Sequence, residues 1–131
     1  AALDRSDWTA SATESAPADP PAYALDGRLD TRFSTGHAQH DSQGFFVSWP
    51  GDRTIGRIRM DVGPSTGDYP RTCGIWVKDS LGAVTFVNCQ ADSNGTVDVS
   101  FTPISAQRIE VWQWGSTGWW WSIAEFNVYQ Q

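Results

Sequence analysis

Apolar side chains alternate with polar ones along several short stretches of this chain, and this alternation limits its fold more than any other feature. Side chains at every second position of a strand lie on one face, so the pattern predicts half-buried β-strands. Gly, Pro and Asn residues separate the stretches, and no run of a dozen residues shows helical periodicity. The sequence therefore predicts an all-β sandwich or barrel. The alternating apolar residues are Ile58, Met60 and Val62; Ile75 and Val77; Val97, Val99 and Phe101; Ile109 and Val111; and Ala124, Phe126 and Val128.

The composition is that of one folded domain. A chain of 131 residues matches the usual size of a single domain, so residues 1–131 are expected to form one core. The net charge of -6 argues against nucleic acid as a partner, because such binding uses clustered Lys and Arg to release counterions. No apolar run approaches the ~20 residues of a membrane span. We therefore expect no membrane insertion, and we expect a monomer.

The two cysteines flank a predicted hairpin. Residues 74–78 and 84–88 resemble two strands, joined by a turn around Leu81. Folding the chain at this turn places Cys73 nearly opposite Cys89, close enough for a disulfide. Such a bridge would indicate an oxidising compartment and hence secretion. The alternative is two buried free thiols in a reducing compartment.

Six short motifs stand in order along the chain. They are Trp8-Thr9-Ala10-Ser11-Ala12; Ala24-Leu25-Asp26-Gly27 with Asp30-Thr31-Arg32-Phe33; Thr35-Gly36; Gln43-Gly44; Asp68-Tyr69-Pro70-Arg71; and the run from Trp120 to Tyr129. Together they resemble the discoidin (coagulation factor 5/8 type C) family, and especially carbohydrate-binding module family 32. The resemblance implies a jelly-roll β-sandwich of about eight antiparallel strands with binding loops at one end. Two departures are Phe33, where the family more often has Trp, and the segment Ser48-Trp49-Pro50.

The same resemblance implies a structural calcium ion. Calcium prefers six to eight hard oxygen ligands, including backbone carbonyls that a Gly-containing loop can present. The ion would join the N-terminal loop to the C-terminal strand. Alternatively, Asp26 only caps a turn and Glu125 pairs with an Arg. The implied ligands are side chains of Asp26, Thr31 and Glu125 and carbonyls of Ala24, Arg28, Thr31 and Ala124.

The eight tryptophans are too many for the core alone. Trp8, Trp49 and Trp76 are expected to be packing residues, and Trp112 and Trp114 are assigned to the core, with partial exposure as the alternative. Trp119, Trp120 and Trp121 follow the turn at residues 115–118, so at least one should project from a loop. An exposed indole can stack on a pyranose ring. The resemblance assigns this role to Trp120, with Trp119 second.

Polar partners for the sugar are expected around these indoles. The resemblance implies a sugar-binding role for Arg71 and His37, and Asp68, Asp61 and Glu14 are candidate acceptors for sugar hydroxyls. The alternatives are that Arg71 pairs with Asp68 to hold its loop and that His37 is a solvated loop residue.

The sequence therefore predicts non-catalytic carbohydrate binding that targets an attached or partner enzyme to a galactose-type or β-linked glycan. An enzyme is disfavoured, because we find no nucleophile motif, no phosphate loop and only two histidines, in one loop. The alternative function is a lipid- or protein-binding discoidin adhesion domain. The negative net charge of this chain argues against the lipid-binding alternative, because anionic lipid headgroups would repel it.

Overall fold

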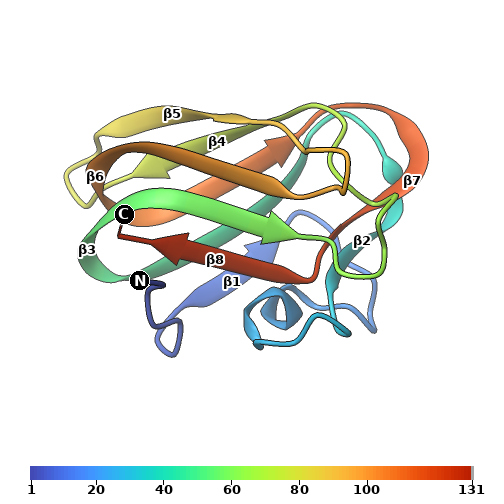
Figure 1. The fold of residues 1–131 in the computed structure, drawn as a ribbon, viewed down its shortest axis with the longest axis horizontal. Helices are drawn as coiled ribbons and strands as arrows, with labels where there is room; N and C mark the ends of the chain where they lie inside the picture. The colour runs from blue at the N-terminus through green and yellow to red at the C-terminus, as the bar shows by residue number, and fades with distance from the viewer. Residues whose placement is uncertain (131) are drawn as a thin grey trace.

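The chain folds into eight β-strands and one short 3-10 helix (Figure 1). The computed structural model describes residues 1–130. All strand pairs are antiparallel, which confirms the predicted all-β jelly-roll sandwich of about eight strands. The elements are β1 (Thr9–Ala12), η1 (Pro21–Leu25), β2 (Phe33–Gln39), β3 (Gln43–Asp61), β4 (Cys73–Lys78), β5 (Val84–Cys89), β6 (Val97–Gln113), β7 (Thr117–Ile123) and β8 (Glu125–Tyr129).

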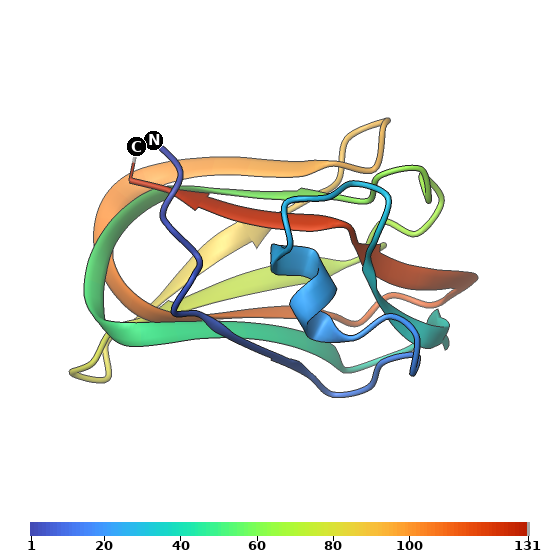
Figure 2. The ribbon, with the colours of Figure 1, turned by 90° about the horizontal axis from the view of Figure 1, so that it is seen from below.

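Two long strands connect the layers of the sandwich. The first half of β3 pairs with β1 and with the second half of β6, whereas its second half pairs with β8 and the first half of β6. The register of β3 and β6 shifts between Ser48 and Arg53, where the strands bend from one layer to the other (Figure 2). Such bends let one strand serve both layers. The unusual segment Ser48-Trp49-Pro50 lies at this bend.

The core forms between the layers. Most of the predicted alternating residues are buried in it, whereas Val99 and Phe101 are only partly buried. Phe33, Phe45 and Trp121, which the alternation did not mark, are fully buried there with Phe126. Trp49 is also buried and donates its indole N–H to the Ala106 carbonyl at 3.0 Å. Trp8 stacks on Trp49 with 4.8 Å between ring centroids. The packing role predicted for Trp8 and Trp49 is therefore confirmed.

Three other tryptophans do not lie in the core, and the assignment of Trp112 and Trp114 to it was wrong. Trp76 and Trp112 are half-buried, and Trp114 is 42% exposed. Ile109 and Val111 point inward, so Trp112 lies on the outer face of β6. There it packs edge to face against Phe46, with ring centroids 5.2 Å apart.

The predicted disulfide is present. Cys73 pairs directly with Cys89 in the β4–β5 register, and a disulfide joins them with a Cα–Cα distance of 5.3 Å. No free cysteine remains among the described residues.

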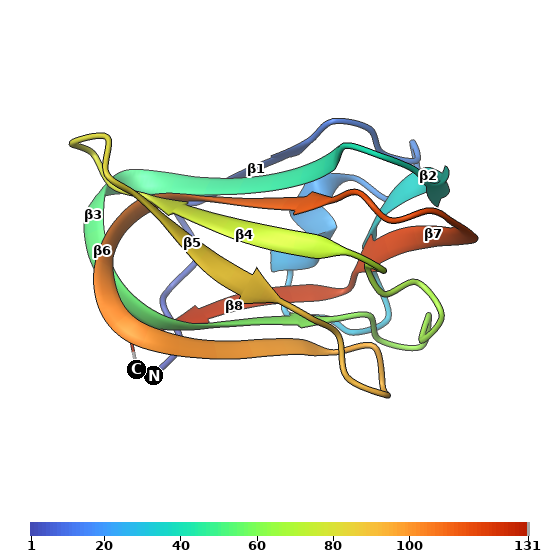
Figure 3. The same ribbon diagram turned by 90° about the horizontal axis from the view of Figure 1, so that it is seen from above.

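The two ends of the domain differ. The N- and C-termini lie side by side at one end, and the β2–β7 pair and the loop between β3 and β4 lie at the other (Figure 3). Ala2 bridges Tyr129, and the Gln130 N–H donates to the Ala1 carbonyl at 3.3 Å. Within residues 1–130, no helix has the length and apolar character required to span a bilayer.

Candidate functional site

Strand β7 carries three consecutive tryptophans with different environments. Trp121 is fully buried, whereas Trp120 is 39% and Trp119 is 56% exposed. In a regular strand, neighbouring side chains point to opposite faces. Here the β2–β7 register shifts on both sides of the pair Ala38 and Trp120. This irregularity accompanies the exposure of two adjacent indoles at the loop end.

The Trp119 ring rests on the backbone of Gly67. A Cβ atom at Gly67 would lie 2.5 Å from two carbons of that ring, which is too close for any larger residue. One face of the indole is therefore covered by the β3–β4 loop. Its 56% exposure leaves the rest of the ring open to solvent.

A buried carboxylate and an arginine lie beside these indoles. Asp68 is only 7% exposed, and its Oδ2 accepts hydrogen bonds from Arg32 Nη1 at 2.8 Å and from the Ser122 hydroxyl at 2.6 Å. Arg32 Nη1 also donates to the Ser65 hydroxyl at 2.7 Å. The Arg32 Cζ atom lies 5.7 Å from the centroid of the Trp120 ring, within range of a cation–π contact.

Together these residues surround an open hollow of about 420 Å³, which we call the tryptophan hollow. Trp119, Trp120 and Asp68, three residues predicted to bind sugar, line it with Arg32. The hollow combines apolar ring surface with a guanidinium and hydroxyl groups, a mixture typical of sites for polar small molecules. Sequence reasoning did not assign Arg32 to this site, although Arg32 stands inside a recognised motif.

Gln39 is a second residue that sequence reasoning missed. It is buried, and its Nε2 donates to the carbonyls of Tyr69 at 2.8 Å and Trp120 at 3.2 Å. Its Oε1 accepts the Arg71 N–H at 3.0 Å. One side chain thus connects β2, β7 and the β3–β4 loop. The only sequence feature that could have indicated this bridging role is the position of a polar residue at the end of a strand.

Arg71 lies outside the tryptophan hollow. Its Nη1 donates to the carbonyls of Gly67 at 3.0 Å and Tyr69 at 2.7 Å, and its Cζ lies 3.7 Å from the centroid of the Tyr69 ring. It lines another hollow, next to the disulfide. Arg71 therefore holds its own loop, although not through Asp68, which pairs with Arg32.

Glu14 and His37 form a separate cluster with His40. Glu14 accepts hydrogen bonds from His40 Nε2 at 2.7 Å and Gln43 Nε2 at 2.6 Å, and His37 Nε2 lies 4.0 Å from its other oxygen. Although burial alone would raise the pKa of Glu14, these bonds hold it below its usual value. The Asp41 carbonyl and then Glu14 raise the pKa of His40. Both partners can only accept hydrogen bonds, which favours the imidazolium form that donates from both ring nitrogens.

Asp61 also lies apart from the indoles. Its carboxylate pairs with Arg59 at 3.1 Å, and it lines another hollow with Asn94 and Thr96. Its position makes it a neighbour of the tryptophan hollow rather than part of it.

Hydrogen bonds connect part of the predicted calcium set, Asp26, Thr31 and Glu125, to the loop between η1 and β2. The Asp26 carboxylate accepts from the Thr31 hydroxyl and from the Arg28 N–H, and Glu125 Oε2 accepts the Gly27 N–H at 2.8 Å. These are hard oxygen donors of the kind calcium prefers, so the chemistry of the side chains suits the ion. The contacts of the alternative are also present: Asp26 accepts the Arg28 N–H in its turn, and Arg5 contacts Glu125 Oε1 at 2.9 Å and the Ala24 carbonyl at 3.4 Å. Within residues 1–130, no three His, Cys, Asp or Glu side chains form a metal site by themselves.

Comparison with known proteins decides the family. The model of the F5/8 type C domain matches residues 8–126, nearly the whole chain. The chain belongs to the F5/8 type C domain family. A search of curated proteins finds no match.

Solved structures with the F5/8 type C fold include several carbohydrate-binding modules. The family 32 module of NanJ from Clostridium perfringens, solved in complex with galactose, is 28% identical, with a TM-score of 0.83 over 97% of this chain and 96% of that one. Chitosan-binding module 1 of a chitosanase/glucanase from Paenibacillus sp. IK-5 is 23% identical, with a TM-score of 0.75 over 92% of both chains. The predicted resemblance to family 32 is thus confirmed at the level of the fold.

Proposed function

We propose that this domain binds carbohydrate without catalysis, and that the sugar occupies the tryptophan hollow. The observation that carries the proposal is the pair of exposed indoles, Trp119 and Trp120, beside the anchored guanidinium of Arg32. Indole faces stack on the C–H face of a pyranose, and a fixed guanidinium donates to its hydroxyls. The galactose complex of the 28% identical NanJ module supports a galactose-type ligand.

The proposal includes a role and a location for the domain. We propose that it brings an attached or partner enzyme to glycan outside the cytoplasm. The disulfide supports this location, because such bonds persist in oxidising compartments. An open site that competes with water gains little from each hydrogen bond, so binding is expected in the range of about 10 μM to 1 mM.

The test is a binding panel with a matched tryptophan control. Isothermal titration with galactose, N-acetylgalactosamine, β-glucan oligosaccharides and glucosamine oligomers covers neutral and cationic sugars. Trp120→Ala is expected to weaken binding by at least about tenfold, or 1.4 kcal/mol. Trp114→Ala removes an indole of similar exposure, 42% against 39%, outside the hollow and is expected to leave affinity unchanged.

Two outcomes would contradict the proposal. One is a folded wild-type protein that binds no sugar in the panel; binding to phosphatidylserine vesicles would then favour a lipid-binding domain. The other is an equal loss of sugar affinity in Trp114→Ala and Trp120→Ala.

We also propose that the loop between η1 and β2 holds a structural calcium ion with Glu125. A ligand that binds only the folded state stabilises it by about 2.7 kcal/mol at 100 times its dissociation constant. Adding EDTA to the calcium-loaded protein is therefore expected to lower the midpoint of thermal unfolding, and calcium should restore it. Glu125→Gln should unfold at a lower temperature and respond less to EDTA. Identical unfolding curves with and without EDTA would refute the proposal.

A further inference from the structure

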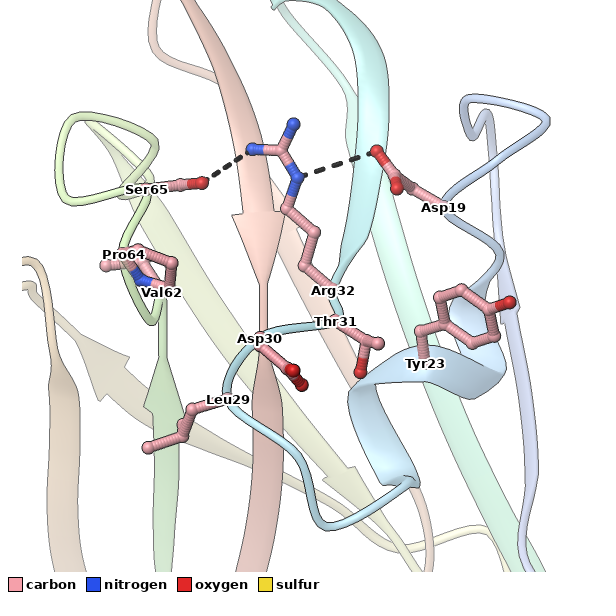
Figure 4. A pocket seen from close by; sticks show the side chains of 9 residues that line it. All are labelled: Asp19, Tyr23, Leu29, Asp30, Thr31, Arg32, Val62, Pro64 and Ser65. Carbon is pink, nitrogen blue, oxygen red and sulfur yellow. Dashed lines mark hydrogen bonds and ion pairs between the residues drawn. The ribbon is translucent and has the colours of Figure 1, made fainter.

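A second hollow of about 200 Å³, whose lining residues Figure 4 shows, shares part of its lining with the tryptophan hollow. It lies between η1, the loop before β2 and the start of the β3–β4 loop. Arg32, Pro64 and Ser65 line both hollows. The two hollows therefore meet at Arg32, and a ligand that extends from one to the other would lie against its guanidinium.

Arg32 is fixed at the boundary and can still donate. Its Nη1 binds Ser65 and Asp68, and its Nε lies 3.5 Å from Asp19 Oδ2, as Figure 4 shows for Ser65 and Asp19. Nη2 has no hydrogen-bond partner within residues 1–130. A guanidinium held on one side with a free N–H₂ group on the other is ready to donate to a ligand hydroxyl.

The walls of the second hollow offer both ring surface and acceptors. Tyr23 on η1 is 40% exposed and Leu29 is 55% exposed, and they border the hollow from opposite sides (Figure 4). The neighbouring Ala24 is fully buried in the core, which anchors the helix that carries Tyr23. Asp19 and Asp30 also line it; Arg28 binds both oxygens of Asp30, and the Ser34 hydroxyl donates to Asp19 Oδ2, which leaves each carboxylate with part of its acceptor capacity. Such a lining suits hydroxyl or ammonium groups on a ring with an apolar face.

We propose that the second hollow binds the sugar residue next to the one held by Trp119 and Trp120. The ligand is then an oligosaccharide of at least two neutral or amino sugars, with Arg32 donating to the ligand where it passes between the hollows. Tyr23 is a specificity-determining residue for chain length. This inference rests on the proposed carbohydrate binding in the tryptophan hollow.

Titration of paired mono- and disaccharides tests the inference. The probes are galactose against N-acetylgalactosaminyl-β-1,3-galactose, and glucosamine against its β-1,4 dimer. The wild-type protein is expected to bind at least one disaccharide about tenfold tighter than its monosaccharide. Tyr23→Ala should reduce that gain to less than about threefold and leave monosaccharide affinity unchanged. Tyr23→Phe, which keeps the ring, should retain most of the gain, and Trp120→Ala should weaken both sugars.

The outcomes separate this inference from the proposed function. Monosaccharide binding that requires Trp120, without any gain for a disaccharide, would refute the second hollow and leave the tryptophan hollow standing. An equal loss for both sugar lengths in Tyr23→Ala would also refute it. If Tyr23→Ala folds poorly by circular dichroism, Leu29→Ala on the opposite wall replaces it with the same expectation. Equal gains for di-galacturonate and the neutral disaccharide would overturn the assigned ligand class.

Discussion

Replacing Asp68 with alanine is expected to lower the free energy of unfolding by about 2–3 kcal/mol, measured by urea denaturation. The substitution removes the buried acceptor shared by Arg32 and Ser122, so the Ser122 hydroxyl loses its partner and Arg32 keeps only Ser65, Ser122 and the more distant Asp19. This loss of stability is expected to be smaller than for a fully buried ion pair, because the Arg32 side chain is 30% exposed. Since Arg32 then loses its shortest ion pair and is held less firmly beside Trp120, sugar affinity should fall with stability.

A second aspartate provides the control for Asp68. Asp98 also pairs with arginines, Arg57 at 2.7 Å and Arg59 at 3.3 Å, but on the exposed face of β3 and β6. Asp98→Ala is expected to cost less than about 1 kcal/mol and to leave sugar affinity unchanged. Equal destabilisation by Asp68→Ala and Asp98→Ala would show that the Asp68 network does not stabilise the loop end.

Removing the disulfide with Cys73→Ala and Cys89→Ala together is expected to lower the free energy of unfolding by about 3 kcal/mol. The bridge closes a loop with a sequence separation of 16, which limits the conformations of the unfolded chain. Urea denaturation of the double variant and the wild type measures the difference.

Reduction supplies the control for the double variant. Dithiothreitol should shift the wild-type curve towards that of the double variant and leave the double variant unchanged. Suppose that thiol titration shows both cysteines of the reduced wild-type protein to be free. An unfolding curve identical to that of the oxidised protein would then contradict a stabilising role for the bridge.

Local patterns predicted the second half of β3, β4, β5, β6, β8 and the disulfide, whereas β1, β2 and β7 carry no clear alternation and were not predicted as strands. Alternation marks which residues of β6 point inward, and Ile109 and Val111 are indeed buried. The Cys73–Cys89 pairing follows from a hairpin whose two strands are adjacent in sequence. The wrong assignment of Trp112 and Trp114 to the core shows that residue type alone does not predict burial. Trp112 is large and apolar, but it shares its strand face with Glu110, and that face points outward.

The site was only partly predictable, because its polar network joins distant segments. The Arg32–Asp68 pair spans 36 positions, and Gln39 reaches a carbonyl 81 positions away. No local periodicity marks such pairs. The indoles could be predicted because they follow a turn, whereas the separation of Glu14 and Asp61 from them depends on how the loops pack. The roles of Arg71, His37, Asp61 and Glu14 in sugar binding remain predictions.

The adjacent termini have a consequence for linking copies of this domain. Both ends of the chain lie at the pole opposite the β2–β7 pair, so a linker attached there leaves the tryptophan hollow unobstructed. Two copies joined by a flexible linker of suitable reach would present two outward-facing sites to one polysaccharide surface. Once the first copy is attached, the second binds at an effective concentration set by the linker, which can raise avidity by about 10²–10⁴ over a single copy.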